Sequence, residues 1–216
     1  MQEKKYMKVL ILTNGDYGDY NFCNNASEYD YIICADKGMD HAKKLNIVPN
    51  LIVGDFDSVD QDILAEFQKR DIEILEYDTH KDVTDTEAAI DEAIQRGATH
   101  IDIWGGLGSR FDHTFANVQL LYKLLNKGIT AALVNSNNKV QMIRDKIILK
   151  GKKGDIVSLI PFSSIVHGVT TYNLEYALKD YDYPMGISYG VSNVMEAEEA
   201  AVTIKDGYLL VIQAID

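Results

Sequence analysis

The residues best suited to chemistry are two aspartates, Asp55 and Asp57, which follow directly on an apolar run at residues 51–54. On an extended backbone, side chains two residues apart point the same way, so we expect both carboxylates to lie together at a strand end. Such a pair is repulsive unless a cation lies between its members, and Mg²⁺ binds carboxylate and phosphate oxygens. A solvated acidic turn, with Ser58 capping the next helix, accounts for the same residues.

A second polar segment, around Thr84, precedes another predicted helix. Thr84 and Glu87 form a capping box, which predicts a helix that begins near Asp85. The helix dipole favours one acidic residue in that first turn. It does not explain why Lys81, Asp82 and Asp85 are crowded into one loop, which leaves a functional role open for this loop.

A glycine-rich loop, at residues 105–108, lies between a predicted strand and a predicted helix. Its three glycines in four residues allow the backbone to approach a phosphate, and the N-terminus of the helix adds free N–H groups and a positive dipole end. Arg110 is able to hold a phosphate through two parallel hydrogen bonds. Asp112 and His113 follow closely, although a single histidine in such a place is more often structural.

The elements that must position these side chains alternate between strand and helix. Strands are predicted at residues 8–13, 31–34, 51–54, 72–77, 100–104 and 130–135. The alternation predicts a doubly wound, mostly parallel sheet with helices on both faces, formed by residues 1–135. Ligands bind such sheets at the edge formed by the carboxyl ends of the strands. We therefore expect this edge to gather the glycine-rich loop with Asp36, Asp55, Asp57 and Asp85, although Asp36 is also explained as a helix cap.

The pattern changes at residue 136 to short, closely spaced strands without helical periodicity. This change predicts a second domain, residues 136–216, which is an antiparallel β-sandwich with a hairpin turn at Asp206 and Gly207. Tyrosines cluster in it, and β-propensity or edge packing explains them. We slightly favour an oligomer interface over an apolar ligand surface as their function. These tyrosines are Tyr172, Tyr176, Tyr181, Tyr183 and Tyr189.

Composition limits the partners and the cellular location. The formal net charge is −12, which argues against binding to nucleic acid or to an anionic membrane. Two cysteines, Cys23 and Cys34, are too few for a disulfide scaffold and fit a reducing compartment. The chain starts with a charged segment, and the short apolar run after it is not a signal peptide or a membrane span. A cytoplasmic location is therefore expected.

Convergent carboxylates together with a phosphate-binding loop, and without a Gly-Lys-Ser sequence of the Walker type, point to Mg²⁺-dependent nucleotide chemistry. Transfer from ATP requires carboxylates for the metal, donors that neutralise the phosphates, and a group that positions the acceptor hydroxyl. Candidates for each are present, but these residues do not identify the acceptor.

The order of these motifs resembles the thiamine pyrophosphokinase family. The resemblance rests on residues 54–58, on Thr84 and Asp85, on residues 105–113, and on the all-β domain that follows them. It implies transfer of the diphosphate of ATP to the hydroxyl of thiamine, which yields thiamine diphosphate and AMP. It also implies Mg²⁺ as cofactor and a homodimer as the working form.

The resemblance also implies residue roles. Asp55, Asp57 and Asp85 correspond to catalytic, metal-binding carboxylates. Residues implied to contact the nucleotide are Asp36, Ser58, Lys81, Thr84, Gly106, Arg110, Asp112 and His113. Residues implied to contact thiamine are Asp85, Ser192 and Asn193. Lys37 departs from the family pattern, which often has glycine there. The only tryptophan, Trp104, lies in the first domain, so stacking in the second domain would have to use tyrosine.

Two alternatives to this function remain open. An enzyme of the same fold and metal requirement would accept another alcohol, such as a hydroxymethylpterin. A nucleotide-sensing module would bind nucleotide without turnover, although a sensor has little reason to keep three convergent carboxylates.

Overall fold

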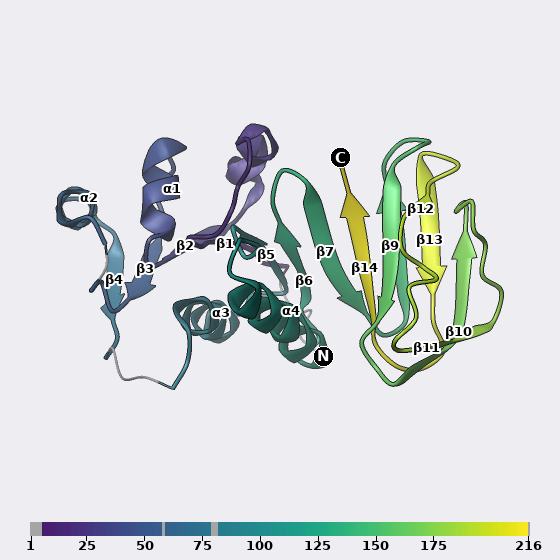
Figure 1. The fold of residues 1–216 in the computed structure, drawn as a ribbon. Coiled ribbons are helices and arrows are strands. Elements are labelled where there is room, and N and C mark those ends of the chain that lie inside the picture. Colours follow the sequence, from purple (N-terminus) through teal and green to yellow (C-terminus); the bar gives the residue numbers. More distant parts are fainter. Residues whose placement is uncertain (1–5, 58, 79–81, 216) are drawn as a thin grey trace. The chain divides into compact units, whose positions relative to one another are not determined.

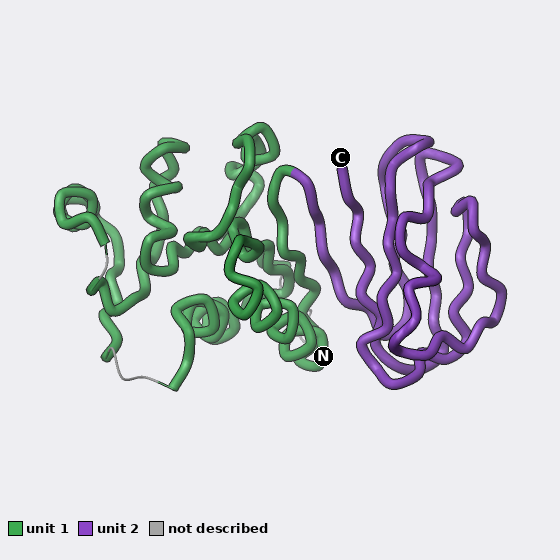
Figure 2. Tube along the Cα trace, in the orientation of Figure 1, with its two compact units in different colours: residues 1–136 green, residues 137–216 purple. Residues whose placement is uncertain are grey.

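The chain divides into two compact units, Met1–Ser136 and Asn137–Asp216 (Figure 2). In this computed structural model, residues 6–57, 59–78 and 82–215 are described. Ser58 and Lys81, two of the predicted nucleotide contacts, therefore lie outside the described residues. Each unit has its own strands and its own buried core.

Six strands of the first unit lie side by side in the order β6-β5-β1-β2-β3-β4, and all of their pairings are parallel. The sheet is covered on both faces, so its central strands are apolar and buried rather than alternating, as in β1 and β3. The strands are β1 (Lys8–Leu12), β2 (Tyr31–Ala35), β3 (Leu51–Gly54), β4 (Glu73–Glu76), β5 (His100–Trp104) and β6 (Thr130–Val134).

Helices lie on both faces of this sheet, as Figure 1 shows with α1 and α2 above the strands and α3 and α4 below them. The connection from β1 to β2 contains a 3₁₀ element, η1. The helices are η1 (Asn21–Glu28), α1 (Gly38–Lys44), α2 (Gln61–Gln68), α3 (Asp85–Gln95) and α4 (Phe111–Asn126). In the described part of the chain, no helix has the length and apolar character needed to span a membrane.

The helix caps explain where two of these helices begin. Thr84 Oγ1 accepts the N–H of Glu87 at 3.2 Å, so α3 begins with the predicted cap. The cap of α2 is Asp60, whose carboxylate accepts the N–H groups of Asp62 and Ile63 at 2.8 and 3.3 Å. Ser58, which the sequence offered as a cap, lies outside the described residues, and the cap that the structure shows is Asp60.

The strand order creates a topological switch point between β1 and β5. These two strands are neighbours, yet the chain leaves β1 toward η1 on one face and leaves β5 toward α4 on the other. The connections that follow them therefore run to opposite faces of the sheet, and a crevice lies at the carboxyl ends of the strands. Ligands of doubly wound sheets bind in such a crevice.

The strands of the second unit pair antiparallel in two sheet layers, in the orders β12-β9-β14-β7 and β11-β10-β13-β8. One apolar cluster draws residues from both sheets, among them Leu149, Val157 and Val202. The fold class predicted from the sequence, a doubly wound domain followed by an antiparallel sandwich, is confirmed. The strands are β7 (Asn138–Ile143), β8 (Lys146–Lys150), β9 (Ile156–Pro161), β10 (Ile165–Tyr172), β11 (Tyr181–Pro184), β12 (Asn193–Val194), β13 (Glu199–Thr203) and β14 (Leu209–Ala214).

Candidate active site

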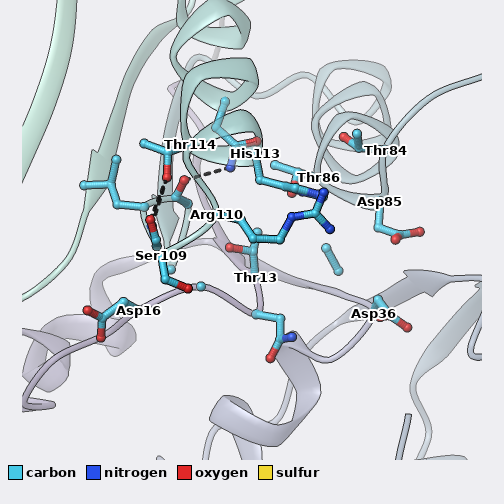
Figure 3. Close-up of a pocket in the computed structure, with 18 residues that line it drawn as sticks. Thr13, Asp16, Asp36, Thr84, Asp85, Thr86, Ser109, Arg110, His113 and Thr114 are labelled. Atoms are coloured by element: carbon cyan, nitrogen blue, oxygen red, sulfur yellow. Dashed lines mark hydrogen bonds between the residues drawn. The ribbon is translucent and has the colours of Figure 1, made fainter. Parts of the chain in front are cut away.

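A cavity of about 620 Å³ lies at the switch point of the first unit (Figure 3). Its walls come from the loops after β1, β2 and β5 and from the first turns of α3 and α4. In Figure 3, Asp16 lies at one end of the cavity, and Asp36 and Asp85 lie at the other. The lining residues are 13–16, Ala35, Asp36, 84–86, 105–110, His113, Thr114 and Asn117.

The glycine-rich loop is fixed by two side chains from α4. Thr114 Oγ1 accepts the N–H of Gly108 at 3.0 Å and donates to the carbonyl of the same residue at 3.1 Å. Asn117 Nδ2 donates to the carbonyl of Gly106 at 2.7 Å, and this amide is buried. The loop is thus held against the N-terminal turns of the helix, where N–H groups and the dipole attract an anion.

Arg110 lines the cavity, and its guanidinium is paired with Asp112. Arg110 Nε and Nη2 contact Asp112 Oδ1 and Oδ2 at 3.2 and 2.5 Å, and both side chains are largely exposed. Hydrogen bonding from Arg110 lowers the pKa of Asp112 to about 2, so the pair stays charged at neutral pH. Asp112 does not itself line the cavity, and its contact in the structure is with the arginine.

Asp36 follows β2 in a left-handed conformation, with φ of 46°, which aspartate tolerates better than most residues. Its N–H donates to the carbonyl of Val53 at 2.7 Å. Gly54 lies so close behind it that a Cβ there would be 3.2 Å from the Asp36 Cα. The cap of α1 is Lys37, without a side-chain cap bond, so the helix-cap explanation of Asp36 does not hold.

Asp55 and Asp57 do not continue β3 in extended conformation. Phe56 between them has φ of 58°, and Asp55 Oδ1 accepts the N–H of Asp57 at 3.2 Å. The segment is therefore a turn, and the predicted extended geometry was wrong. Asp55 is half-buried and Asp57 exposed, and neither lines the cavity. Their predicted metal-binding role stays a prediction.

The predicted thiamine contacts of the second unit lie at the start of β12. Ser192 is exposed and left-handed, with φ of 60°, and its N–H donates to Ser158 Oγ at 3.0 Å. Asn193 is 3% exposed. Its side-chain oxygen accepts the N–H of Tyr176 at 2.9 Å, and its side-chain nitrogen donates to the carbonyl of Tyr176 at 2.8 Å. Asn193 therefore fixes the backbone at Tyr176, in addition to any contact with a ligand.

The cavity also includes residues that the motifs did not assign. Asn14, Gly15 and Asp16, in the loop after β1, lie in its wall. Thr114 and Asn117 follow Arg110 at helical spacing, so the 3.6-residue period, applied from Arg110 onward, would have found them.

Within the described ranges, no group of three or more His, Cys, Asp or Glu side chains is arranged to hold a metal ion. Three aspartates line the cavity, and two of them, Asp36 and Asp85, lie at the same end of it (Figure 3). Mg²⁺ usually binds one or two carboxylates and completes its shell with water and substrate phosphates, so this donor set fits Mg²⁺ bound together with a nucleotide.

A doubly wound sheet with a glycine-rich loop, an arginine and three aspartates at its switch point defines an α/β protein of the nucleotide-binding class. Comparison with known proteins gives the family. Residues 22–133 match the catalytic domain model of thiamin pyrophosphokinase, and residues 145–209 match the vitamin B1 binding domain model of the same family. The chain belongs to the thiamine pyrophosphokinase family, and the resemblance drawn from the motifs is confirmed.

Individual relatives agree with this assignment over most of the chain. Thiamine pyrophosphokinase of Bacillus subtilis (strain 168) is 30% identical over 191 residues, which cover 88% of this chain and 89% of that protein. The crystal structure of the B. subtilis enzyme matches with a TM-score of 0.88 at 26% identity, covering 97% of this chain and 99% of that one. A thiamin pyrophosphokinase family protein from Enterococcus faecalis matches with a TM-score of 0.84 at 27% identity, with the same coverage.

Proposed function

We propose that this protein is a thiamine diphosphokinase, which transfers the diphosphate of ATP to the hydroxyl of thiamine. The products are thiamine diphosphate and AMP, so the hydroxyl oxygen forms a bond to the β-phosphorus, the bond from that phosphorus to AMP breaks, and the hydroxyl proton is released. The observation that carries the proposal is the cavity at the switch point, which combines a phosphate-binding loop, Arg110 and three aspartates in a chain of this family.

In this proposal the first unit binds ATP. The backbone of residues 105–108 and the N-terminus of α4 surround the phosphates, and Arg110 pairs with them. Asp112 holds the guanidinium before the nucleotide arrives, because two of its nitrogens already contact that carboxylate. Gly106, Thr84, Asp36 and His113 complete the wall around the nucleotide.

Asp55, Asp57 and Asp85 are proposed as ligands of Mg²⁺, of which Asp85 lines the cavity. Bound Mg²⁺ would neutralise charge on the transferring phosphates. The left-handed conformation of Phe56 and the bond from Asp57 to Asp55 set the turn that carries the other two carboxylates.

Thiamine is proposed to contact the second unit, which matches the vitamin B1 binding domain over residues 145–209. That match includes Ser192 and Asn193. The same unit exposes large apolar side chains, which support a homodimer as the working form. They include Tyr172, Tyr176, Met185, Ile187, Tyr189 and Val191. We further propose a cytoplasmic location, supported by the two cysteines, which are buried and free.

The deciding experiment measures AMP formed from ATP by the purified protein. We expect AMP to appear only when both thiamine and Mg²⁺ are present. Turnover of a hydroxymethylpterin in place of thiamine would establish the alternative acceptor, and nucleotide binding without AMP would establish a sensing module. Formation of ADP instead of AMP would exclude any diphosphate transfer.

A further inference from the structure

Tyr17 lies behind the wall of the cavity rather than in it, and it is 2% exposed. Its hydroxyl donates to the carbonyl of Trp104 at 3.2 Å. The same carbonyl accepts the N–H of Thr13 at 2.9 Å and the hydroxyl of Thr13 at 3.1 Å. Three donors from the loop after β1 therefore converge on the last carbonyl of β5, directly before the glycine-rich loop.

The ring of Tyr17 fills space that the glycine-rich loop leaves open. Gly105 has φ of 73°, and a Cβ on it would lie 2.4 Å from Tyr17 Cε2. Gly15, in the loop after β1, lies equally close to the glycine-rich loop, since a Cβ on Gly15 would lie 1.9 Å from the carbonyl oxygen of Gly105. Asp16 N–H also donates to the carbonyl of Leu107 at 2.7 Å. The loops after β1 and β5 are thus in direct backbone contact, with Tyr17 packed behind that contact.

The other face of the Tyr17 ring packs on α1. It stacks on His41, with ring centroids 3.8 Å apart and planes 14° apart. Tyr20 Oη and His41 Nδ1 are hydrogen-bonded at 2.8 Å, which holds the imidazole in place. Helix α1 begins two residues after Asp36, the carboxylate in the cavity wall. Tyr17 itself belongs to the loop after β1, and it contacts both the start of the loop after β5 and the helix that follows the loop after β2. These are the three strand-end loops that line the cavity.

We propose that Tyr17 is a positioning residue for the ATP-binding loop, and that it sets the distance between the walls formed by residues 14–16 and 105–110. The hydroxyl fixes the end of β5, and the ring supports the backbone contact between the two loops from behind. This inference rests on the proposed function, because it assigns the cavity to ATP. Tyr17 acts through Gly105 and His41 and does not touch the substrate.

The test compares Tyr17→Phe and Tyr17→Leu with the wild type by steady-state kinetics. Tyr17→Leu removes both the stack and the hydrogen bond, so we expect the KM for ATP to rise about tenfold, because small displacements of positioning groups are costly. Tyr17→Phe keeps the ring and removes one of three hydrogen bonds, so the expected rise is about threefold. The KM for thiamine should not change in either variant.

Tyr29→Phe is the matched control. Tyr29 packs edge-on against the same Trp104, with ring centroids 5.9 Å apart, but its hydroxyl donates to Asp102 at 2.6 Å instead of to the loop support. The Tyr29→Phe variant should be less stable than the wild type but have an unchanged KM for ATP. The proposal is overturned if the Tyr17 variants lose activity only in proportion to their unfolded fraction, or if they raise the KM of both substrates equally.

Calorimetric titration with ATP in the absence of thiamine separates this proposal from the proposed function. If the wild type binds ATP but forms no AMP, the proposed function fails, and the affinities of the Tyr17 variants still decide the positioning role. If Tyr17→Leu does not fold, Tyr17→Phe alone decides, and an ATP affinity equal to that of the wild type contradicts the proposal.

Discussion

Asp85 and Asp82 are close in sequence but differ in their surroundings. Asp85 lies in the first turn of α3 and lines the cavity, whereas Asp82 is exposed before the cap of that helix. A carboxylate that faces transferring phosphates with a metal contributes far more to turnover than to folding. The two positions therefore make a matched pair.

We expect Asp85→Asn to lower AMP formation by at least about 100-fold, because an amide is a poor replacement for an ionised metal ligand. Unfolding by urea should show a loss of only about 0.3–1 kcal/mol, from the weaker interaction with the helix dipole. Asp82→Asn should keep near-normal turnover. Equal activity of the two variants would contradict a metal or substrate role for Asp85.

Residue type and position in the chain selected Asp36, Asp85, Arg110 and the glycine-rich loop as members of this edge of the sheet. The family resemblance added Thr84 and His113. The conformation of the segment from Asp55 to Asp57 was not predictable in the same way, because nothing in the sequence signals that a phenylalanine adopts positive φ. The ring of Phe56 is 8% exposed and belongs to the apolar core, and its burial offsets the cost of the left-handed backbone.

At the level of elements, the site depends on the contact between the loops after β1 and β5. A Cβ on Gly15 would lie 1.9 Å from one backbone carbonyl oxygen and 2.5 Å from another, so the loops must separate to admit it. We expect Gly15→Ala to weaken ATP binding about 100-fold or more, because both walls of the cavity move. Calorimetric titration with ATP measures this loss.

Gly128→Ala is the comparison for that variant. Gly128 has φ of 72°, and a Cβ there would meet nothing within 4 Å. Gly128→Ala should therefore lower the free energy of unfolding by about 1 kcal/mol through backbone strain and leave the affinity for ATP unchanged. Similar ATP affinities for Gly15→Ala and Gly128→Ala would show that the loop contact does not control the cavity.

The helix that follows the glycine-rich loop shows the limit of periodicity. The 3.6-residue period places Phe115 and Tyr122 on the same face of α4 as the buried Val118, but they are 47% and 42% exposed, whereas the polar Asn117 is buried. The period gives the spacing of a face but not its partner. Asn117 is buried because its amide satisfies the carbonyl of Gly106, a contact between two elements that the local pattern does not encode.

At the scale of the whole molecule, the alternation of strands and helices predicted the doubly wound sheet, and the loss of that alternation predicted the antiparallel sandwich. Which strands pair with each other in the sheet was harder to predict from the sequence. β5 pairs with β1, more than 80 residues earlier in the chain, rather than with β4. Such a pairing depends on how the completed elements pack, and it decides where the crevice lies.

The stability of the molecule should depend on pH through His41. Burial, with a smaller effect from Lys44, lowers the pKa of His41 from 6.5 to about 4 in the folded protein. Between these values the unfolded chain binds the proton and the folded chain does not, so the free energy of unfolding decreases as pH falls from 6.5 toward 4. His41→Phe keeps a stacking ring and removes the titration.

Urea denaturation of the wild type and His41→Phe at several pH values measures this effect. The difference in free energy of unfolding between the two proteins should change across that window and be constant above it. A difference that does not vary with pH would mean that His41 takes up its proton equally well in both states, and that the packed stack with Tyr17 does not exclude the imidazolium.

The single tryptophan of the chain gives the molecule a built-in optical probe. Trp104 is 1% exposed and packs edge-on against Phe22, with ring centroids 5.3 Å apart, while its backbone adjoins the glycine-rich loop. All indole emission therefore originates from one rigid position at the base of the cavity. A spectral change on adding nucleotide would report on that position alone, without an attached dye.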